Sequence, residues 1–292
     1  MITRLTVRLC CGLLLVFSTT LLGCAVHPYR AGVDLKTDLD VALRPGEAQV
    51  ERGEPVLLVD SIGWLIGAPS KLLFLDHRID NHDVSAETEQ ALTQYLALNG
   101  LDRVKVHVNR YDPGDDWSRL FRNESVGGFW KYTLGSIWVL HDTLIPGRLI
   151  GGDSYNPFTN TIRLYSDNPA IALREGAHAK AIAQTKWKGT ATAAAMLPLV
   201  PLFSESRAVG DVLGYVAEHR SDLEQEAYET LYPSYAIGAP GALALGMTPV
   251  DRFLLQAAFA VPGHILGQVR SAQVPDRRET ALAGPRPRPP GS

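Results

Sequence analysis

The chain has 292 residues, with 28 lysines and arginines against 31 aspartates and glutamates. This length allows one large domain or two small ones, and the ordinary apolar content predicts a sizeable core. The formal net charge of −3 argues against a nucleic-acid partner, and the three cysteines, Cys10, Cys11 and Cys24, include no C-x-x-C metal-ligand pair.

The N-terminus has the features of an export signal over residues 1–23. Arginines at positions 4 and 8 precede an apolar run that is too short and one-sided for a typical membrane span. The run ends in Leu21-Leu22-Gly23-Cys24, which resembles the lipobox of bacterial lipoproteins. The resemblance implies cleavage before Cys24 and acylation of its sulfur, with palmitate among the acyl groups. A plain secretory signal or an uncleaved anchor helix is the alternative.

This resemblance also implies a location. Ala25, and not aspartate, follows Cys24, which in Gram-negative lipoproteins indicates the outer membrane, with the domain facing the periplasm. Two or more acyl chains anchor a protein stably to a lipid bilayer. After cleavage the chain would contain no free cysteine, as suits an oxidising envelope.

Residues 24–54 are expected to form a polar tether, and the first elements of secondary structure are expected after it. Residues 55–76 are apolar but interrupted by charges and a proline, so we expect them to be buried or to lie on the membrane without spanning it. Residues 85–100 predict a helix that is capped by Ser85 and closed by Asn99-Gly100.

Strands and short helices are expected in the next part of the chain. The alternating valines of residues 104–108 predict a half-buried strand. A short helix is expected to begin near Asp115, and a strand is expected near Ser136–Leu140. Turn residues then precede a further strand over Thr161–Tyr165.

The sequence predicts that the second half of the chain is mainly helical. Asn168-Pro169 is a typical helix start and predicts a helix over about 169–187. A second long helix is expected over about 204–230, with Ser204 as its cap. The apolar segments 190–203 and 249–270 are expected to form a flank that packs on the domain or faces the membrane. The Pro- and Arg-rich tail, 276–292, is expected to be disordered.

Residues 174–178 read Arg-Glu-Gly-Ala-His and differ from the zinc-peptidase motif H-E-x-x-H at the first position only. In that motif the residues at i and i+4 share one helix face and bind one metal, and the glutamate takes a proton from the metal-bound water. Glu175 therefore holds the general-base position, and His178 holds the second-ligand position. Glu205, three residues before Ala208, resembles the third ligand of the gluzincins.

The stretch from about Pro69 to Tyr215 is similar to a family of bacterial envelope proteins with a zincin-like domain. The similarity rests on SKLLF, DNHDVS, YTLG, PGRLIGGDSYNPFTNTIRLYSD, GAHAKAIA and SESRA. It implies an α+β fold over residues 55–275, with a small mixed sheet, the site helix across it and the Glu205-bearing helix beside it. It also implies a histidine where this chain has Arg174.

Arg174 changes the chemistry that the motif predicts. A guanidinium is always protonated and has no lone pair, so it cannot bind zinc. His178 and Glu205 alone are one protein ligand fewer than catalytic zinc sites use. We expect Arg174 to replace the metal charge and to pair with Glu205 and Glu175, which would otherwise be uncompensated carboxylates.

Other candidate residues have ordinary alternatives. Tyr155 and Tyr165 flank a strand that lines the substrate cleft of zincins and could stabilise an oxyanion there, but core or edge packing is the more common role of such residues. Asp211 could orient His178 or be a surface charge. His178 could be a simple helix histidine, and Glu205 could complement a helix dipole.

Three functions remain open at the level of sequence. The first is a membrane-anchored, zincin-like lipoprotein that has lost catalysis and acts by binding an envelope protein or peptide. The second is an active zinc peptidase with a non-standard ligand set, in which zinc is the cofactor and Glu175 the base. The third is a structural envelope lipoprotein. The first interpretation expects no cofactor.

Overall fold

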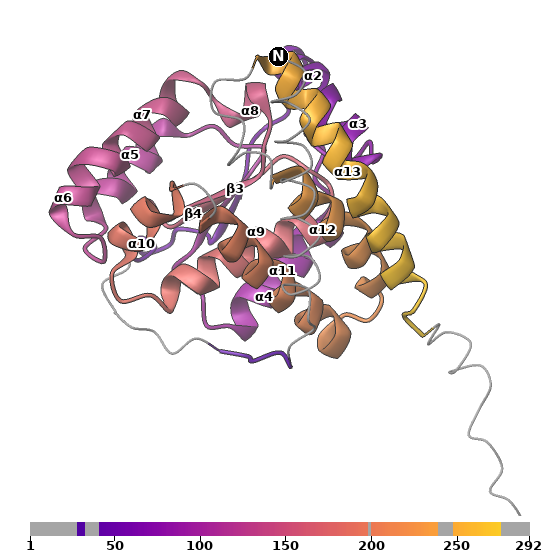
Figure 1. Ribbon diagram of the computed structural model, residues 1–292. Coiled ribbons are helices and arrows are strands. Elements are labelled where there is room, and N and C mark those ends of the chain that lie inside the picture. Colours follow the sequence, from indigo (N-terminus) through magenta and orange to yellow (C-terminus); the bar gives the residue numbers. More distant parts are fainter. Residues whose placement is uncertain (1–27, 33–40, 198–199, 239–247, 276–292) are drawn as a thin grey trace, which may run out of the picture.

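The computed structural model describes residues 28–32, 41–197, 200–238 and 248–275. The predicted signal peptide, the predicted lipidation site Cys24 and the predicted tail 276–292 lie outside these ranges. The described residues form an α+β fold (Figure 1). Its helices are α2 (Leu57–Ile66), α3 (Ala68–Phe74), α4 (Ala86–Leu98), α5 (Pro113–Arg122), α6 (Gly128–Trp130), the π-helix η1 (Lys131–Gly135), α7 (Ser136–Leu144), α8 (Gly147–Ile150), α9 (Pro169–Ala183), α10 (Lys188–Ala195), α11 (Val200–His219), α12 (Glu224–Gly238) and α13 (Pro249–Ser271).

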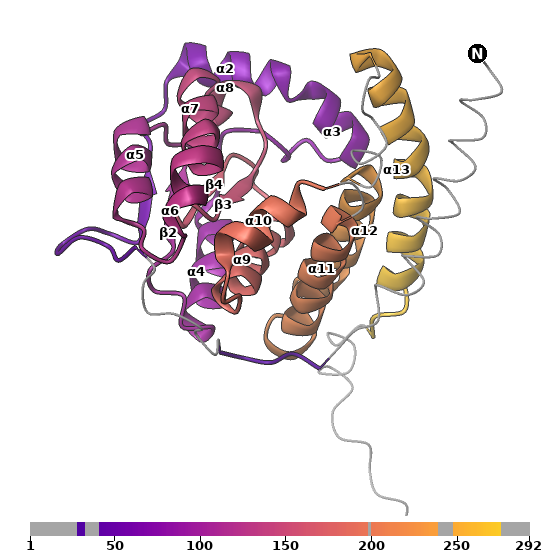
Figure 2. The same cartoon turned by 60° about the vertical axis from the view of Figure 1, so that its left-hand side comes forward.

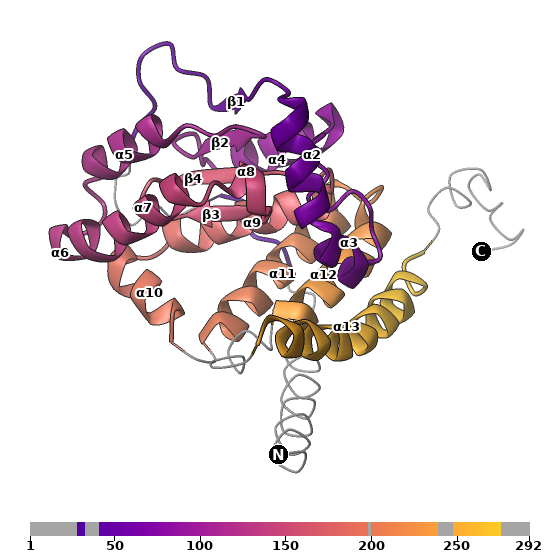
Figure 3. The same ribbon diagram turned by 90° about the horizontal axis from the view of Figure 1, so that it is seen from above.

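Four short strands form one mixed sheet, as expected. They are β1 (Val50–Arg52), β2 (Lys105–Val108), β3 (Ser154–Asn156) and β4 (Thr161–Leu164), and they lie in the order β1-β2-β4-β3 (Figure 3). The pairs β1–β2 and β2–β4 are parallel, whereas β3 runs antiparallel to β4 at the edge. Val50 pairs with Val106, which in turn pairs with Ile162, so the sheet joins segments that are far apart in the chain.

The two faces of the sheet differ in chemistry. Side chains alternate across a strand, and the buried valines Val106 and Val108 belong to the main hydrophobic core, which also includes side chains of α4, α9, α11 and α12. The intervening residues Lys105 and His107 face the other way and are also fully buried. Helices α5 and α7 cover this second face (Figures 1 and 2).

Several local predictions are confirmed. The Ser85 side chain accepts a hydrogen bond from the Thr88 amide and caps α4. Asn168 likewise caps α9 by accepting from the Ile171 amide at 3.1 Å, with Pro169 in the first turn. These starts were predictable because cap residues act on the backbone only a few positions away.

Two predictions of strand structure are wrong. The segment Ser136–Leu140 lies in helix α7 and not in a strand, because a short apolar run has no period that separates a strand from a buried helix. The strand at residues 104–108 was expected to be half-buried, but every residue of β2 is buried. Ion-paired side chains on the polar face, such as Lys105, account for the difference.

The predicted helix boundaries also need correction. The site helix ends at Ala183 and not near 187, and Lys188 begins α10. The helix predicted over about 204–230 is two helices, since α11 begins at Val200 and a turn at Ser221–Leu223 separates it from α12. Ser204 therefore lies inside α11, where its hydroxyl donates to the Pro201 carbonyl at 2.9 Å. Helix α5 begins at Pro113, slightly earlier than expected.

Candidate functional site

Helix α9 carries the central residues of the candidate site and is held between other helices. Its face toward α4 is close-packed because position 176 is glycine: a Cβ atom there would lie 2.9 Å from the Tyr95 ring. Helix α11 contacts α9 from another side, and α12 also touches it. The same helix therefore presents Arg174 and His178 toward residues of α11 and α12.

Arg174 is joined to the residue that follows it. Its Nη2 atom lies 2.7 Å and its Nε atom 3.1 Å from Oε1 of Glu175, and its Nη1 donates to the Ser234 hydroxyl of α12. The Arg174 side chain is 17% exposed and that of Glu175 only 5% exposed. The carboxylate in the general-base position is thus buried and held by the guanidinium.

His178 and Glu205 form the second pair of the site. The Nε2 atom of His178 lies 3.1 Å from Oε1 of Glu205, which α11 supplies. The prediction that Arg174 pairs with Glu175 agrees with this geometry, whereas Glu205 has His178 as its direct partner. Arg174 still acts on Glu205 through its charge.

The charges of the site shift the pKa values of its members. Burial raises the pKa of Glu175 above its usual value, although Arg174 and His178 oppose this effect. Burial alone would lower the pKa of His178, but the carboxylate of Glu205 outweighs it and raises that pKa. For Glu205, the charges of His178 and Arg174 outweigh burial and lower its pKa to about 2.

These shifts predict a bell-shaped pH dependence for the stabilisation by the His178–Glu205 pair. The pKa values in the unfolded chain are 4.5 for glutamate and 6.5 for histidine. The pair therefore contributes its full stabilisation between pH 4.5 and pH 6.5. It is lost as the pH falls toward the Glu205 pKa of about 2, and it declines as the pH rises through the raised pKa of His178. Since both groups are partly exposed, we expect a maximum of about 1 kcal/mol.

The measurement is the difference in free energy of unfolding between the native chain and Glu205→Gln across this pH range. NMR titration of His178 in both proteins provides the direct check, because removal of the carboxylate should lower the imidazole pKa. An unchanged His178 titration in Glu205→Gln would contradict the pairing.

Two further carboxylates were not predicted: Asp153 acts on Arg174 through its charge, and Asp80 acts in the same way on Asp153. Asp153 accepts from the amides of Tyr165 and Ser166 at 2.7 and 3.1 Å, and it contributes to the field at Arg174. Asp80 accepts from the Gly152 amide at 2.8 Å. Burial raises the pKa of both groups, and the charge of Asp80 raises that of Asp153 further. The signal that could have found Asp153 is the pair of glycines before it, both of which adopt positive φ angles.

The two predicted cleft tyrosines have other contacts. The Tyr155 hydroxyl donates to Oδ1 of Asn160 at 2.9 Å from the edge strand β3. Tyr165 is 1% exposed, and its ring lies 5.4 Å from that of His82. Burial raises its pKa. The packing interpretation therefore suits Tyr165 better than a role in binding an oxyanion.

Asp211 does not orient His178, which was one of the two alternatives for this residue. Its Oδ1 atom lies 2.7 Å from Nζ of Lys180, and its Oδ2 accepts from the Tyr95 hydroxyl. Asp211 thus joins α11 to α9 and α4 at a position apart from the Arg174 pair. The alternative of an ordinary surface charge is also too simple, since this bond network is partly buried.

The side chains of the site do not fit a catalytic zinc ion. The first-ligand position holds a cation, and the Glu175 carboxylate is engaged by that cation. Nε2 of His178 and Oε1 of Glu205 are directed at each other. Over residues 28–32, 41–197, 200–238 and 248–275, no group of three or more His, Cys, Asp or Glu side chains is arranged to hold a metal.

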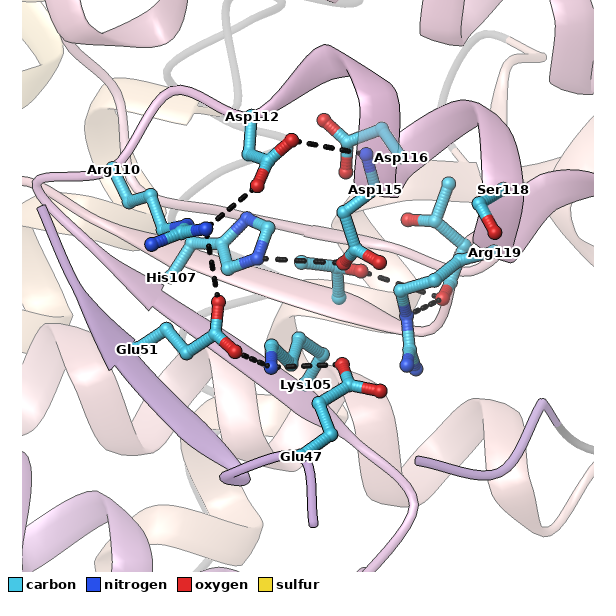
Figure 4. A network of polar contacts seen from close by, with 12 residues as sticks. Glu47, Glu51, Lys105, His107, Arg110, Asp112, Asp115, Asp116, Ser118 and Arg119 are labelled. Carbon is cyan, nitrogen blue, oxygen red and sulfur yellow. Dashed lines mark hydrogen bonds and ion pairs between the residues drawn. The ribbon is translucent and has the colours of Figure 1, made fainter. Parts of the chain in front are cut away.

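A second polar cluster fills the space between the sheet and α5 (Figure 4). Lys105 lies 2.8 Å from Glu47 and 2.7 Å from Glu51, and Arg110 links Glu51 to Asp112. Farther along, Arg163 on β4 binds Asp116 of α5 at 2.7 Å and Asp142 of α7 at 2.8 Å. Charges of alternating sign thus replace an apolar layer, which gives this cluster a structural role.

His107 lies in the same layer and is fully buried, with its Nε2 atom 3.6 Å from Oδ2 of Asp115. The interaction lowers the pKa of Asp115 despite the opposing effect of burial. This distance is long for a hydrogen bond, so we regard the pair as electrostatic. This layer lies on the opposite face of the sheet from the main core, to which helix α9 with Arg174 belongs.

Comparisons with known proteins give no further assignment: no family model, curated protein or solved structure matches the chain.

Proposed function

We propose that this chain is a zincin-like protein, anchored in the bacterial envelope through acylated Cys24, that binds a protein or peptide instead of hydrolysing it. The observation that carries the proposal is the pairing of Arg174 with Glu175 at 2.7 Å. In a zinc hydrolase, the glutamate of the motif must be free to take a proton from water. Here its carboxylate is engaged by a permanent cation at the place of the first metal ligand.

The chemistry of the four side chains supports a binding role. Arg174 supplies a fixed positive charge beside Glu175, and the raised pKa of His178 favours the imidazolium opposite Glu205. The cluster therefore balances its own charges and offers no Lewis acid for polarising a carbonyl. Arg174 and His178 can still donate hydrogen bonds to a bound polypeptide.

The sheet supports the same proposal. Strand β3 is an edge strand that runs antiparallel to its neighbour, and it contacts helix α9. An extended peptide commonly binds proteins by adding a strand at such an edge. A peptide bound there would lie next to the helix that carries Arg174, which would place binding and charge recognition together.

Metal analysis of the purified protein and of Arg174→His tests the proposal. We expect the native chain to hold far less than one zinc per molecule, because only His178 and Glu205 remain as ligands. Arg174→His restores the motif and should bind about one zinc per chain with the usual three protein ligands. Arg174→Lys is the matched control, since it keeps a cation and should bind no more zinc than the native chain.

Two outcomes would overturn the proposal in different ways. Stoichiometric zinc together with peptidase activity in the native chain would establish an active enzyme with a non-standard ligand set. Failure of folded Arg174→His to bind zinc would remove the support for a zincin scaffold. The anchor is tested separately by mass analysis of Cys24, which should carry acyl chains in the native protein and none in Cys24→Ser.

A further inference from the structure

Helices α2, α3 and α13 carry a surface that is unusually rich in exposed aliphatic side chains. We call the following residues the apolar face: Leu57, Leu58, Ile62, Trp64, Leu65 and Ile66 of α2, Leu72 of α3, the adjoining Leu75, and Val250, Leu254, Val261, Ile265 and Val269 of α13. Leu57 is 86% exposed and Leu65 67% exposed. An apolar area of this extent commonly marks an interaction surface.

The three helices form one continuous support for this face. Helices α2 and α3 meet at a bend of 49°. Helix α3 packs on α13 through a cluster that includes Leu73 and Ala260, and Nε2 of His264 lies 2.9 Å from the Leu73 carbonyl oxygen. Figures 1 and 2 show α13 running from the end of the molecule where α2 and α3 lie toward the opposite end.

The inner sides of these helices are fixed, so the apolar side chains are directed outward. In α13, Gly263 and Gly267 lie so close to α12 that a Cβ atom would come within 2.8 and 2.7 Å of its atoms. In α2, Asp60 binds Arg148 at 2.8 Å, and Gly63 is buried against His82. The exposed stripe is therefore a property of the packed fold.

The N-terminal segment would place the lipid anchor of the proposed function near the C-terminal end of α13. The Tyr29 hydroxyl accepts from Asn99 at 2.6 Å, its amide donates to Glu218 at 2.9 Å, and Nζ of Lys180 lies 4.2 Å from its ring centroid. Cys24 precedes Tyr29 by five residues, which span at most about 18 Å. Residues 28–32 lie at the end of the molecule where α13 terminates (Figures 1 and 2).

We propose that the apolar face lies flat on the lipid bilayer, with α13 along the surface and α2–α3 inserted into the interfacial layer. No single helix among the described residues is long and apolar enough to cross a membrane, but α2 and α3 together meet those criteria as a bent pair. The bend and the Asp60–Arg148 pair favour insertion along the surface over a crossing. Trp64 suits the interface, where indole rings concentrate.

Two observations favour lipid over a protein partner. The face is mainly aliphatic, whereas the centres of protein interfaces are enriched in aromatic residues and arginine. In α13, no Asp, Glu, Lys or Arg occurs between Arg252 and Arg270. The proximity of the bilayer rests on the lipid anchor of the proposed function, which gives the face a high effective concentration of membrane.

The test places an environment-sensitive fluorescent probe on single cysteines in the full chain, with Cys10 and Cys11 changed to serine. Leu65→Cys and Val261→Cys report on the apolar face, and Trp187→Cys is the matched control, because Trp187 is equally exposed but lies beyond the end of α9. Each protein is reconstituted into phosphatidylethanolamine–phosphatidylglycerol vesicles, with and without nitroxide groups on the acyl chains. The parent chain without an added cysteine measures any label on Cys24.

We expect blue-shifted emission at positions 65 and 261, and loss of that emission in the nitroxide vesicles, with neither effect at position 187. Emission typical of water at both face positions would overturn the proposal. A blue shift that the nitroxide lipids do not quench would also overturn it, and would indicate a covering protein such as a second copy of this chain. If Cys24 carried no acyl groups, the anchor in the proposed function would be wrong. The fluorescence of the probes would still show separately whether the apolar face contacts lipid.

Discussion

We expect Arg174→Met to lower the free energy of unfolding by about 3–5 kcal/mol at neutral pH, because removing one member of a buried ion pair leaves the other uncompensated. The remaining carboxylate, Glu175, is 5% exposed and would keep only its weaker interaction with the charge of His178. Burial already raises the pKa of Glu175. Protonation therefore relieves the unpaired charge, and the loss of stability should shrink as the pH falls. Denaturant unfolding at several pH values measures both effects.

A double variant and a surface pair serve as controls for this result. Arg174→Met combined with Glu175→Gln removes both charges and should recover most of the lost stability. Arg52→Met disrupts a pair with Glu89 of the same length, 2.7 Å, but the two side chains are 44% and 32% exposed. We expect it to cost at most about 1 kcal/mol. Equal losses in Arg174→Met and Arg52→Met would show that Arg174 does not compensate a buried charge.

The second large effect is expected at Arg163, on the polar face of the sheet. Arg163→Met leaves Asp116 and Asp142 without the cation that joins them, and the Arg163 and Asp116 side chains are 8% and 7% exposed. We expect a loss of about 3–5 kcal/mol in the free energy of unfolding. If the slope of the unfolding free energy against denaturant concentration stays unchanged, the native state of the variant is as compact as that of the native chain.

Arg110→Met is the control within the same layer. Arg110 pairs with Glu51 at 3.2 Å and Asp112 at 2.7 Å, but its side chain is 34% exposed. The expected loss is at most about 1 kcal/mol. If Arg163→Met cost no more than Arg110→Met, the buried network would not stabilise the fold in the way that its geometry indicates.

The elements that depend on local interactions could be predicted from the sequence. Helix α9 is an example, because Asn168 and Pro169 define its start within one turn. The segment around Ser136 could not be assigned in this way, since its short apolar run suits a strand as well as a helix. The end of the same site helix at Ala183 was missed because Lys188 and Gly189 begin the next helix instead of marking the end of α9.

The site residues that lie on a single helix could be predicted from the sequence. Arg174, Glu175 and His178 could be related by their spacing, and the resemblance to gluzincins pointed to Glu205. The contributions of Asp153 and Ser234 arise only when separate segments meet in the fold. For the same reason, the alternation in β2 suggested a solvent face, although Lys105 is fully buried against Glu47 and Glu51.

The parallel arrangement of the sheet also constrains how the chain folds. Val50, Val106 and Ile162 become neighbours only after long intervening segments have been brought together, so the sheet cannot nucleate from adjacent residues. Folding is slower where contacts join distant parts of a chain. Helices such as α4 and α9 can form early, whereas the charges around Arg163 compensate one another only once β4 is in register. We therefore expect β1, β2 and β4 to come together late in folding, after these helices have formed.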